Sequence, residues 1–349
     1  MRKILLFLLV GALPIVNSCE KKKDVQGCTD ADATNYNADA TVDDESCTYN
    51  YDASTDKNEA KQAAGNTTTG IYEDLMVFTM VQYESDNNAG LGKTNGTTPT
   101  PACANVSITP SLPTVWPKKL TIDFGTTNCL CDDGKYRTGK IEARFNDSWV
   151  TPTSNGPKDS MVVTLTNYHV NDTMLMGTRI FVKDSISASV LSITAIVNNA
   201  GVVFPGTSGN DTLNWSYTGS VKLTFGNKGD YNDNVVSLNI SGNVDTKVGT
   251  YAIQTLQTLS TQFSCLSTCV FTAGQLKLSN TEAQSVKVGP KTYSASVTTA
   301  YTLDFGTGSC DGTINSSTNV VGVNTTDSSE LFNESSSETI NCDDFTDWE

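Results

Sequence analysis

Residues 120–129 of this 349-residue chain read Leu120-Thr121-Ile122-Asp123-Phe124-Gly125-Thr126-Thr127-Asn128-Cys129. Apolar side chains at positions 120, 122 and 124 alternate with polar ones. Successive side chains of a β-strand point to opposite faces, so this alternation predicts a strand with one buried face. The same alternation occurs in residues 141–145, 221–225 and 236–240. The sequence therefore predicts several half-buried strands.

Turn signals that contain glycine separate these stretches. They include Asp133-Gly134, Asn155-Gly156-Pro157, Ser208-Gly209-Asn210 and Ser241-Gly242-Asn243. Many strands with frequent turns, and no alternation of strands with helices, predict an all-β protein built as a sandwich or as layered antiparallel sheets.

Residues 51–100 differ from the rest because part of them has a helical pattern. Helix-forming residues run over positions 57–64 and stop at Gly65. Three apolar residues then recur at helical spacing: Ile71, Leu75 and Phe78. We expect a short helical segment near the N-terminus, within residues 52–86, that lays one apolar face on the main domain, followed by a loop over residues 87–101.

The pattern of residues 120–129 returns near the C-terminus as Tyr301-Thr302-Leu303-Asp304-Phe305-Gly306-Thr307-Gly308-Ser309-Cys310. Both copies combine a strand with Asp-Phe-Gly-Thr, two further residues and a cysteine. Such an internal repeat predicts two related sub-domains, residues 101–200 and residues 201–330. An acidic tail would follow over residues 331–349.

Asp123 and Asp304 hold equivalent positions in the two copies and point away from the apolar face. One interpretation is structural: each carboxylate bonds backbone amides of the following turn, where Gly125 and Gly306 supply the turn conformation. The other is chemical, because two carboxylates about 5–10 Å apart are the catalytic pair of glycan-active hydrolases. The sequence leaves both interpretations open.

Residues 1–18 have the features of a secretion signal: a basic start, a short apolar run over residues 4–10 and a small residue before Cys19. The stretch Leu13-Pro14-Ile15-Val16-Asn17-Ser18-Cys19 resembles the lipobox of bacterial lipoproteins. This resemblance implies that residues 1–18 are removed and that Cys19 becomes the lipidated first residue, held in a membrane by its acyl chains. An uncleaved anchor is not expected, because a spanning helix needs a longer apolar run of about 20 residues.

Residues 19–50 form a charged tether and an acidic segment bracketed by Cys28 and Cys47. The segment 27–47, with its Gly-Cys-Thr-Asp start and Asn-Tyr-Asn centre, resembles a short module of Bacteroidota surface proteins, and a disulfide between its cysteines would close it. Its carboxylates also suggest a calcium site: Asp30, Asp32, Asp39, Asp43 and Asp44. The EF-hand template fails, because Asn35 and Thr41 replace its glycine and its final glutamate. The alternative is a solvated stem without metal.

The stretch from Thr121 to Ile141 contains Asp-Phe-Gly, a cysteine, Asp-Gly and Arg-x-Gly-Lys-Ile in that order. It resembles an uncharacterised family of Bacteroidota lipoproteins. The resemblance implies a lipid-anchored protein of the bacterial outer membrane, on the cell surface or the periplasmic face. It brings no known activity with it.

The chain has ten cysteines, and an exported protein meets an oxidising compartment in which disulfides persist. With Cys19 lipidated, nine remain, so at least one thiol stays outside a disulfide within the chain. We expect Cys28 to pair with Cys47, Cys103 with Cys129 or Cys131, and Cys269 with Cys310, leaving Cys342 as the unpaired thiol. The alternative is a zinc site of Cys129, Cys131, Cys265 and Cys269, whose spacing departs from the usual Cys-x2-Cys.

Weaker patterns concern ligands and modification. The aromatic residues Trp116, Trp149, Trp215, Tyr168 and Tyr217 are either a sugar-stacking platform or ordinary core. Asp-Ser and Asp-Thr pairs before an apolar residue resemble the O-glycosylation sequon of Bacteroidota exported proteins, which implies sugar sites at Ser160, Thr173, Ser185 and Thr212. His169 is the single histidine, and no Gly-x-Ser-x-Gly or His-Glu-x-x-His motif accompanies it.

The net charge of −15 repels phosphate backbones and argues against nucleic acid as a partner. We expect a lipid-anchored extracytoplasmic β-protein that acts as a binding or structural surface module for a glycan or protein ligand, and not as an enzyme. The alternatives are a glycan-active hydrolase using Asp123 and Asp304, and a calcium-dependent adhesion module using residues 28–47.

Overall fold

The computed structural model describes residues 23–88, 101–112, 114–131, 134–147, 159–204, 211–226, 232–265 and 269–342. Cys19, the predicted signal and Trp149 lie outside these residues. The chain divides into two compact units. One holds Met1–Tyr51 with Lys287–Lys291, and the other holds Asp52–Val286 with Thr292–Glu349.

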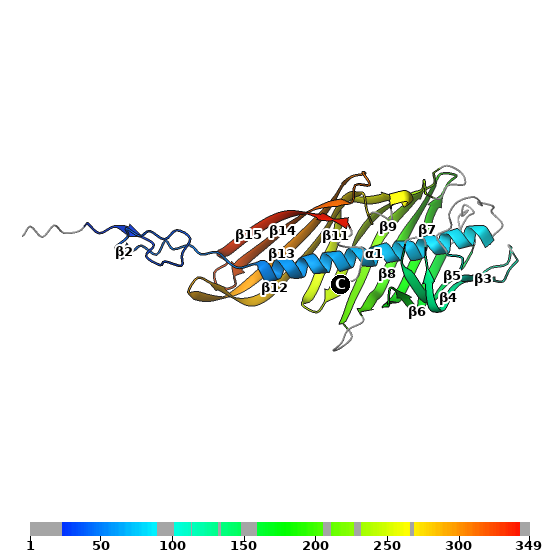
Figure 1. The fold of residues 1–349 in the computed structure, drawn as a ribbon, viewed down its shortest axis with the longest axis horizontal. Coiled ribbons are helices and arrows are strands. Elements are labelled where there is room, and N and C mark those ends of the chain that lie inside the picture. The colour runs from blue at the N-terminus through cyan, green and yellow to red at the C-terminus, as the bar shows by residue number, and fades with distance from the viewer. Residues whose placement is uncertain are drawn as a thin grey trace, which may run out of the picture. The chain divides into compact units, whose positions relative to one another are not determined.

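The second unit contains one long helix and a series of strands (Figure 1). The helix is α1 (Ser54–Asn88). The strands are β3 (Asn105–Thr109), β4 (Lys118–Leu130), β5 (Tyr136–Phe145), β6 (Ser160–Val170), β7 (Thr173–Ile186), β8 (Val190–Phe204), β9 (Asp211–Thr224), β10 (Val235–Thr246), β11 (Gly249–Gln262), β12 (Ala273–Val288), β13 (Lys291–Thr307), β14 (Thr313–Asn324) and β15 (Glu330–Asn341). A 3-10 helix, η1 (Phe263–Cys265), follows β11.

In the described residues, these thirteen strands form one antiparallel sheet in which each strand bonds to its neighbours in sequence. The register places the predicted core positions opposite one another: Ile122 lies opposite Ile141, and Val221 opposite Leu238. The prediction of a β-protein with a helix near the N-terminus is confirmed.

The sheet differs from the prediction in its continuity. The expected boundary between sub-domains at residue 200 falls inside β8, and the strands on either side of it belong to the same sheet. The expected acidic tail is also wrong at its start, because residues 330–341 form the edge strand β15. Phe332 and Ile340 are buried on this strand, and two apolar anchors among serines are too sparse to show the alternation in sequence.

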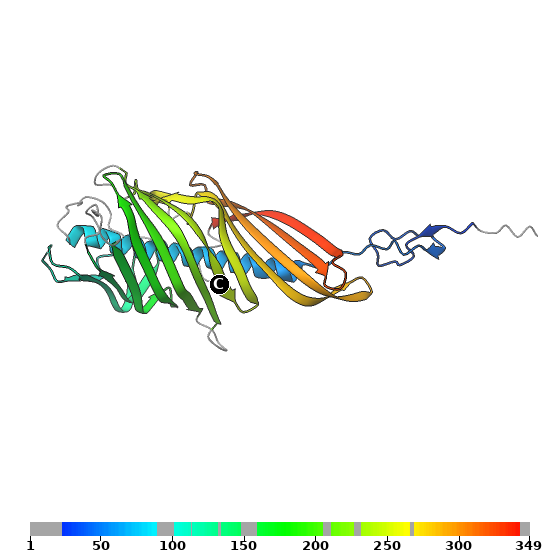
Figure 2. The ribbon, with the colours of Figure 1, turned by 180° about the vertical axis from the view of Figure 1, so that it is seen from behind.

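Helix α1 lies along one face of the sheet and crosses its strands (Figures 1 and 2). It contacts β14, β10 and β4. The helix agrees with the expected helical region 52–86 and continues through Gly65. Nearly every side chain from Ala63 to Ser85 is buried, where one apolar face was expected. Thr68 and Thr69 can be buried in this helix because their hydroxyls donate hydrogen bonds to the carbonyl oxygens of Ala64 and Gly65, at 2.8 and 3.1 Å.

No helix in the described parts of the chain combines the length and the hydropathy needed to cross a membrane.

The unit that contains the predicted stem has little regular structure. Strand β1 (Gln26–Gly27) pairs in parallel with β2 (Val42–Asp43). The chain is closed by the expected disulfide between Cys28 and Cys47. Side-chain hydrogen bonds complete the unit, and one of them joins the Tyr49 hydroxyl to Asp30 Oδ2 at 2.7 Å. This segment is therefore organised by a covalent link and by turns, as its small size requires.

The internal repeat is real as a local conformation. The carboxylate of Asp123 accepts a hydrogen bond from Gly125 N at 3.0 Å, and that of Asp304 accepts one from Gly306 N at 2.9 Å. Gly125 and Gly306 have φ angles of 77° and 79°, a region that glycine enters without strain. The phenylalanine between each pair is buried. The two copies thus repeat a turn within one sheet and do not mark two sub-domains.

Gly70 offers a test of how closely α1 packs on the sheet. A Cβ at this position would come within 2.9 Å of ring carbons of Trp215, which is 1% exposed. Alanine is intrinsically better than glycine in a helix, yet we expect Gly70→Ala to destabilise the protein by about 1–3 kcal/mol through overpacking. Urea denaturation followed by circular dichroism measures this. Asn58→Ala, at an exposed position of the same helix, should cause no loss, and a neutral or stabilising Gly70→Ala would contradict the close contact.

Candidate functional site

The candidate catalytic aspartates are not brought together. Asp123 lies on β4 and Asp304 on β13, with eight strands between them in the sheet. Asp123 forms an ion pair with Lys140 at 2.7 Å, and this bond is the main reason why the pKa of its carboxyl is lowered. Asp304 accepts a hydrogen bond from Gln275 Nε2 at 2.8 Å. Both carboxylates therefore have structural partners, and the geometry does not favour a hydrolase that uses them as a pair.

The five aspartates proposed for calcium act as turn residues. Asp43 and Asp44 accept backbone bonds from Glu45 and Ser46, each at 3.0 Å, and Asp30 accepts one from Asp32 N at 3.0 Å. The hydrogen bond from Tyr49 lowers the pKa of Asp30. Asp39 donates its own N–H to Asn37 Oδ1. Among the described residues, no group of three or more His, Cys, Asp or Glu side chains is placed to hold a metal ion.

Four disulfides link the described cysteines. They are Cys28–Cys47, Cys103–Cys129, Cys265–Cys310 and Cys269–Cys342. The expected pairing of Cys269 with Cys310 is wrong, and the expectation that Cys342 stays outside the disulfides is also wrong. The described cysteine outside the four disulfides is Cys131. It is buried, and its sulfur lies 3.6 Å from the carbonyl oxygen of Cys129. The zinc alternative is wrong because three of its four cysteines are in disulfides.

The four proposed aromatic residues that the structure describes do not form an exposed platform. Trp215, Tyr168 and Tyr217 are buried, and Trp116 is half-buried beside the ammonium group of Lys118, which lies 5.2 Å from its ring centre. His169 is half-buried on β6, and its Nδ1 lies 2.9 Å from the Asn167 carbonyl oxygen.

The four proposed glycosylation residues differ in exposure. Ser185 and Thr212 are exposed, and Ser160 is half-buried. Thr173 is 3% exposed, so its hydroxyl is not accessible in the folded chain. Of the four, Ser185 and Thr212 fit an attached sugar best.

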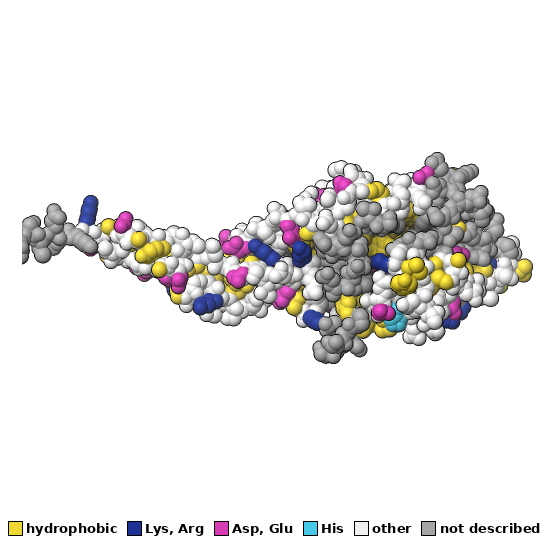
Figure 3. All heavy atoms as spheres, viewed as in Figure 1, with side chains coloured by type: hydrophobic (Ala, Val, Ile, Leu, Met, Phe, Trp, Pro, Cys, Tyr) yellow, Lys and Arg dark blue, Asp and Glu magenta, His cyan; other side chains and the backbone are white. Residues whose placement is uncertain are grey.

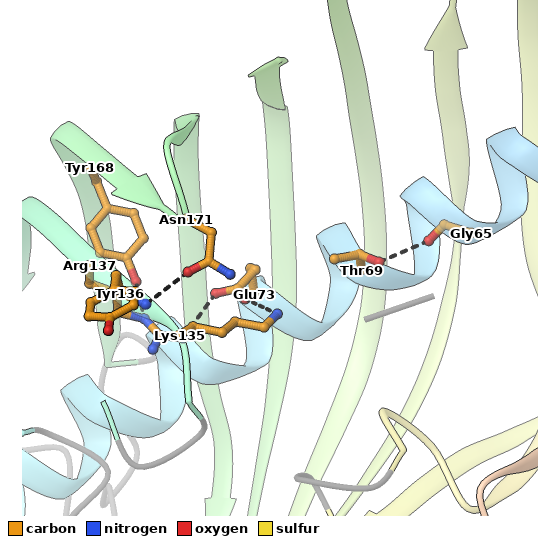
Figure 4. A network of polar contacts seen from close by, with 8 residues as sticks. All are labelled: Gly65, Thr69, Glu73, Lys135, Tyr136, Arg137, Tyr168 and Asn171. Atoms are coloured by element: carbon orange, nitrogen blue, oxygen red, sulfur yellow. Dashed lines mark hydrogen bonds and ion pairs between the residues drawn. The ribbon is translucent and has the colours of Figure 1, made fainter. Parts of the chain in front are cut away.

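A buried network of charged side chains, which the sequence reasoning missed, joins α1 to the sheet. Its first centre is Glu73, whose side chain is fully buried (Figure 4). Its two carboxylate oxygens meet Lys135 Nζ at 3.0 Å and Arg137 Nη2 at 3.4 Å. Arg137 Nε donates to the Tyr168 hydroxyl at 3.0 Å. Burial raises the pKa of Tyr168, so the hydroxyl keeps its proton near neutral pH.

The second centre is Asp74, the next residue of the helix. Arg179 of β7 reaches its Oδ1 with Nε and Nη2, both at 2.7 Å. Trp215 Nε1 and the Tyr217 hydroxyl, both from β9, donate to its Oδ2 at 2.9 and 3.1 Å. Both carboxylate oxygens are therefore satisfied, as a buried charge requires. The network neutralises and positions its own charged groups, because its members bond one another.

A sequence signal for this network existed in β7. Leu175, Arg179, Phe181 and Lys183 share one face of the strand, and all four are buried. A cation in phase with core residues predicts a buried acidic partner. Arg179 has Asp74, and Lys183 has Asp159, whose carboxylate lies 2.5 Å from its Nζ.

A shallow groove of about 640 Å³ lies on strands β11 to β15. Its lining residues are Leu256, Lys277, Ala300, Thr302, Ser317, Thr318, Asn319, Ser335, Ser336 and Ser337. Ala300 and Thr302 alternate with the buried Tyr301 and Leu303, so the groove lies on the face of the sheet opposite the core.

The opposite side of the molecule, on which α1 lies, is seen in Figure 3. On its described part, acidic and basic side chains are interspersed and form no large basic patch.

Removal of Asp74 tests the buried network. We expect Asp74→Ala to destabilise the protein by about 3–5 kcal/mol, because it leaves the Arg179 guanidinium buried without its counter-charge. Lys119→Ala, which removes one side of the more exposed Lys119–Glu142 pair, should cost less than about 1 kcal/mol. Equal losses of unfolding free energy in the two variants, measured by urea denaturation, would show that the buried pair stabilises the protein no more than the more exposed one.

The cysteine assignment predicts a distinct labelling pattern. Cys131 should resist a thiol-alkylating reagent in the native protein, because it is buried, and should react fully once the chain is unfolded without reductant. Peptide mapping by mass spectrometry then locates the label. Labelling of Cys342 under these conditions, or of Cys131 in the native state, would contradict the structure.

Comparison of the chain with protein-family models, with curated proteins and with solved structures finds no match.

Proposed function

We propose that this chain is a lipid-anchored protein of the bacterial outer membrane that acts outside the cytoplasm as a binding or structural surface module. The observation that carries the proposal is the set of four disulfides in the described residues. Disulfides persist in oxidising compartments and are rare in the cytosol of most organisms. This supports export, which the signal features of residues 1–18 predict independently.

The anchor is proposed at Cys19, on the lipobox resemblance of residues 13–19. Each buried methylene of an acyl chain contributes about 0.8 kcal/mol, and two or more chains hold a protein stably on a membrane. In sequence, the disulfide-closed segment 28–47 separates Cys19 from the sheet. A covalent loop of this kind suits a stem better than an independent domain.

The fold favours binding or a structural role over catalysis. The two candidate catalytic aspartates are separated by eight strands, and the buried charges of α1 are used in packing. What the sheet offers instead is a broad, rigid surface. On β11 to β15 its outer face carries short polar side chains on paired strands, which are suited to contact with a ligand.

Acylation of Cys19 tests the proposal. In a bacterial host that processes lipoproteins, we expect the full chain to incorporate labelled palmitate and to appear in the detergent phase on Triton X-114 partition. Cys19→Ser should abolish both, because the acceptor sulfur is lost. Cys131→Ser is the matched control and should keep both. Mass spectrometry of an unmodified N-terminus that includes residues 1–18 would contradict the proposal.

A further inference from the structure

The groove on β11 to β15 is lined mainly by small polar residues, and seven of the ten are serine, threonine or asparagine. Thr318 and Ser336 are in register with the buried Tyr301 and turn toward the core face. The other five present a hydroxyl or amide group to the groove: Thr302, Ser317, Asn319, Ser335 and Ser337. Hydroxyls both donate and accept hydrogen bonds and rotate to suit a partner. The lining contains no aromatic residue and no carboxylate. A surface of this kind matches a ligand that is itself rich in hydroxyls, and offers little to a flat apolar one.

The strands hold these groups in fixed rows. Thr302 lies opposite Ser317, which in turn lies opposite Ser337. In the next row, Asn319 lies between Ala300 and Ser335, and its Nδ2 donates to Ser335 Oγ at 2.8 Å. Short side chains on a paired sheet lose little conformational entropy on binding. The groove is therefore preformed, which is the usual condition of a small-molecule or oligomer site.

The dimensions favour an elongated ligand. The groove extends from Leu256 of β11 to Ser335 of β15, which is four steps between neighbouring strands, or about 19 Å at the usual spacing. Its lining residues come from five neighbouring strands, so it crosses the strands. Figure 2 shows the face of the sheet that lies away from α1. A short segment of a polymer fits this course better than a single compact metabolite.

Charge restricts the ligand further. Lys277 is the single ionisable residue among the ten, and the chain as a whole carries −15. An acidic polymer would meet long-range repulsion from that net charge. We infer that the groove binds a segment of a neutral glycan, through hydrogen bonds from its serine and threonine rows and not through aromatic stacking. This inference rests on the proposed role as a surface binding module.

The test is affinity electrophoresis of the full chain in native gels that contain dextran, yeast mannan or laminarin, with alginate as an acidic comparison. We expect at least one neutral polymer to retard the protein and alginate not to. Ala300→Leu, which fills the groove, should weaken the retarding interaction at least tenfold. Ser296→Leu is the matched control, since Ser296 is half-buried on the same face of β13 but outside the groove, and it should bind normally.

A second variant protects the test against misfolding. Thr302→Val keeps the side-chain shape, removes one hydroxyl and should weaken binding several-fold with an unchanged melting temperature. Retardation by none of the neutral polymers, stronger retardation by alginate, or normal binding by both Ala300→Leu and Thr302→Val would overturn the inference. The result is separable from the anchoring test, because palmitate incorporation at Cys19 is measured independently of the groove.

Discussion

The buried ion pair between Asp74 and Arg179 sets the main constraint on this structure. A carboxylate that is 2% exposed is tolerable only when its charge and hydrogen bonds are satisfied. Its partners come from β7 and β9, up to 143 residues further along the chain. Any shift of α1 by one turn would separate Asp74 from these donors and Glu73 from Lys135 and Arg137. The two adjacent acids therefore fix the position of the helix on the sheet.

This constraint matters because the helix contacts strands that lie far apart in the sheet. Each strand bonds to its sequence neighbours, so the pairing from β3 to β15 is local. In the described residues, β3 and β15 are the edges, and β15 carries Glu330, Glu334 and Glu338 along its length. Acidic edge residues discourage pairing with a second sheet. Helix α1 is what connects distant strands, since it contacts β4, β10 and β14.

Local patterns in the sequence predicted local structure well. The alternation around Ile122 located its strand, and the Asp-Phe-Gly turns have the expected bonds from Asp123 and Asp304. The extent of the helix was predicted, although Gly65 and the threonines that follow it have low helix propensity; burial against the sheet outweighs that. The burial of nearly all of its side chains was not predicted. The pairing of Cys265, Cys269, Cys310 and Cys342 depends on how η1 and the ends of β13 and β15 meet, which no spacing encodes. The buried Arg179 was detectable from its phase with Phe181, but its partner on α1 was not.

The sheet has an inner face, which packs against α1, and an outer face, and the two differ in the side chains that they offer to a ligand. In the described residues, α1 packs on the inner face, with Trp215 against Gly70 and also bonded to the Asp74 carboxylate. On the outer face of β11 to β15, rows of small polar side chains replace the large residues that would close the groove. Core packing does not require small polar residues at these positions, because side chains such as Thr302 and Ser317 point away from the core. Serine and threonine rows on a face that the core leaves unused are therefore best explained by what that face contacts.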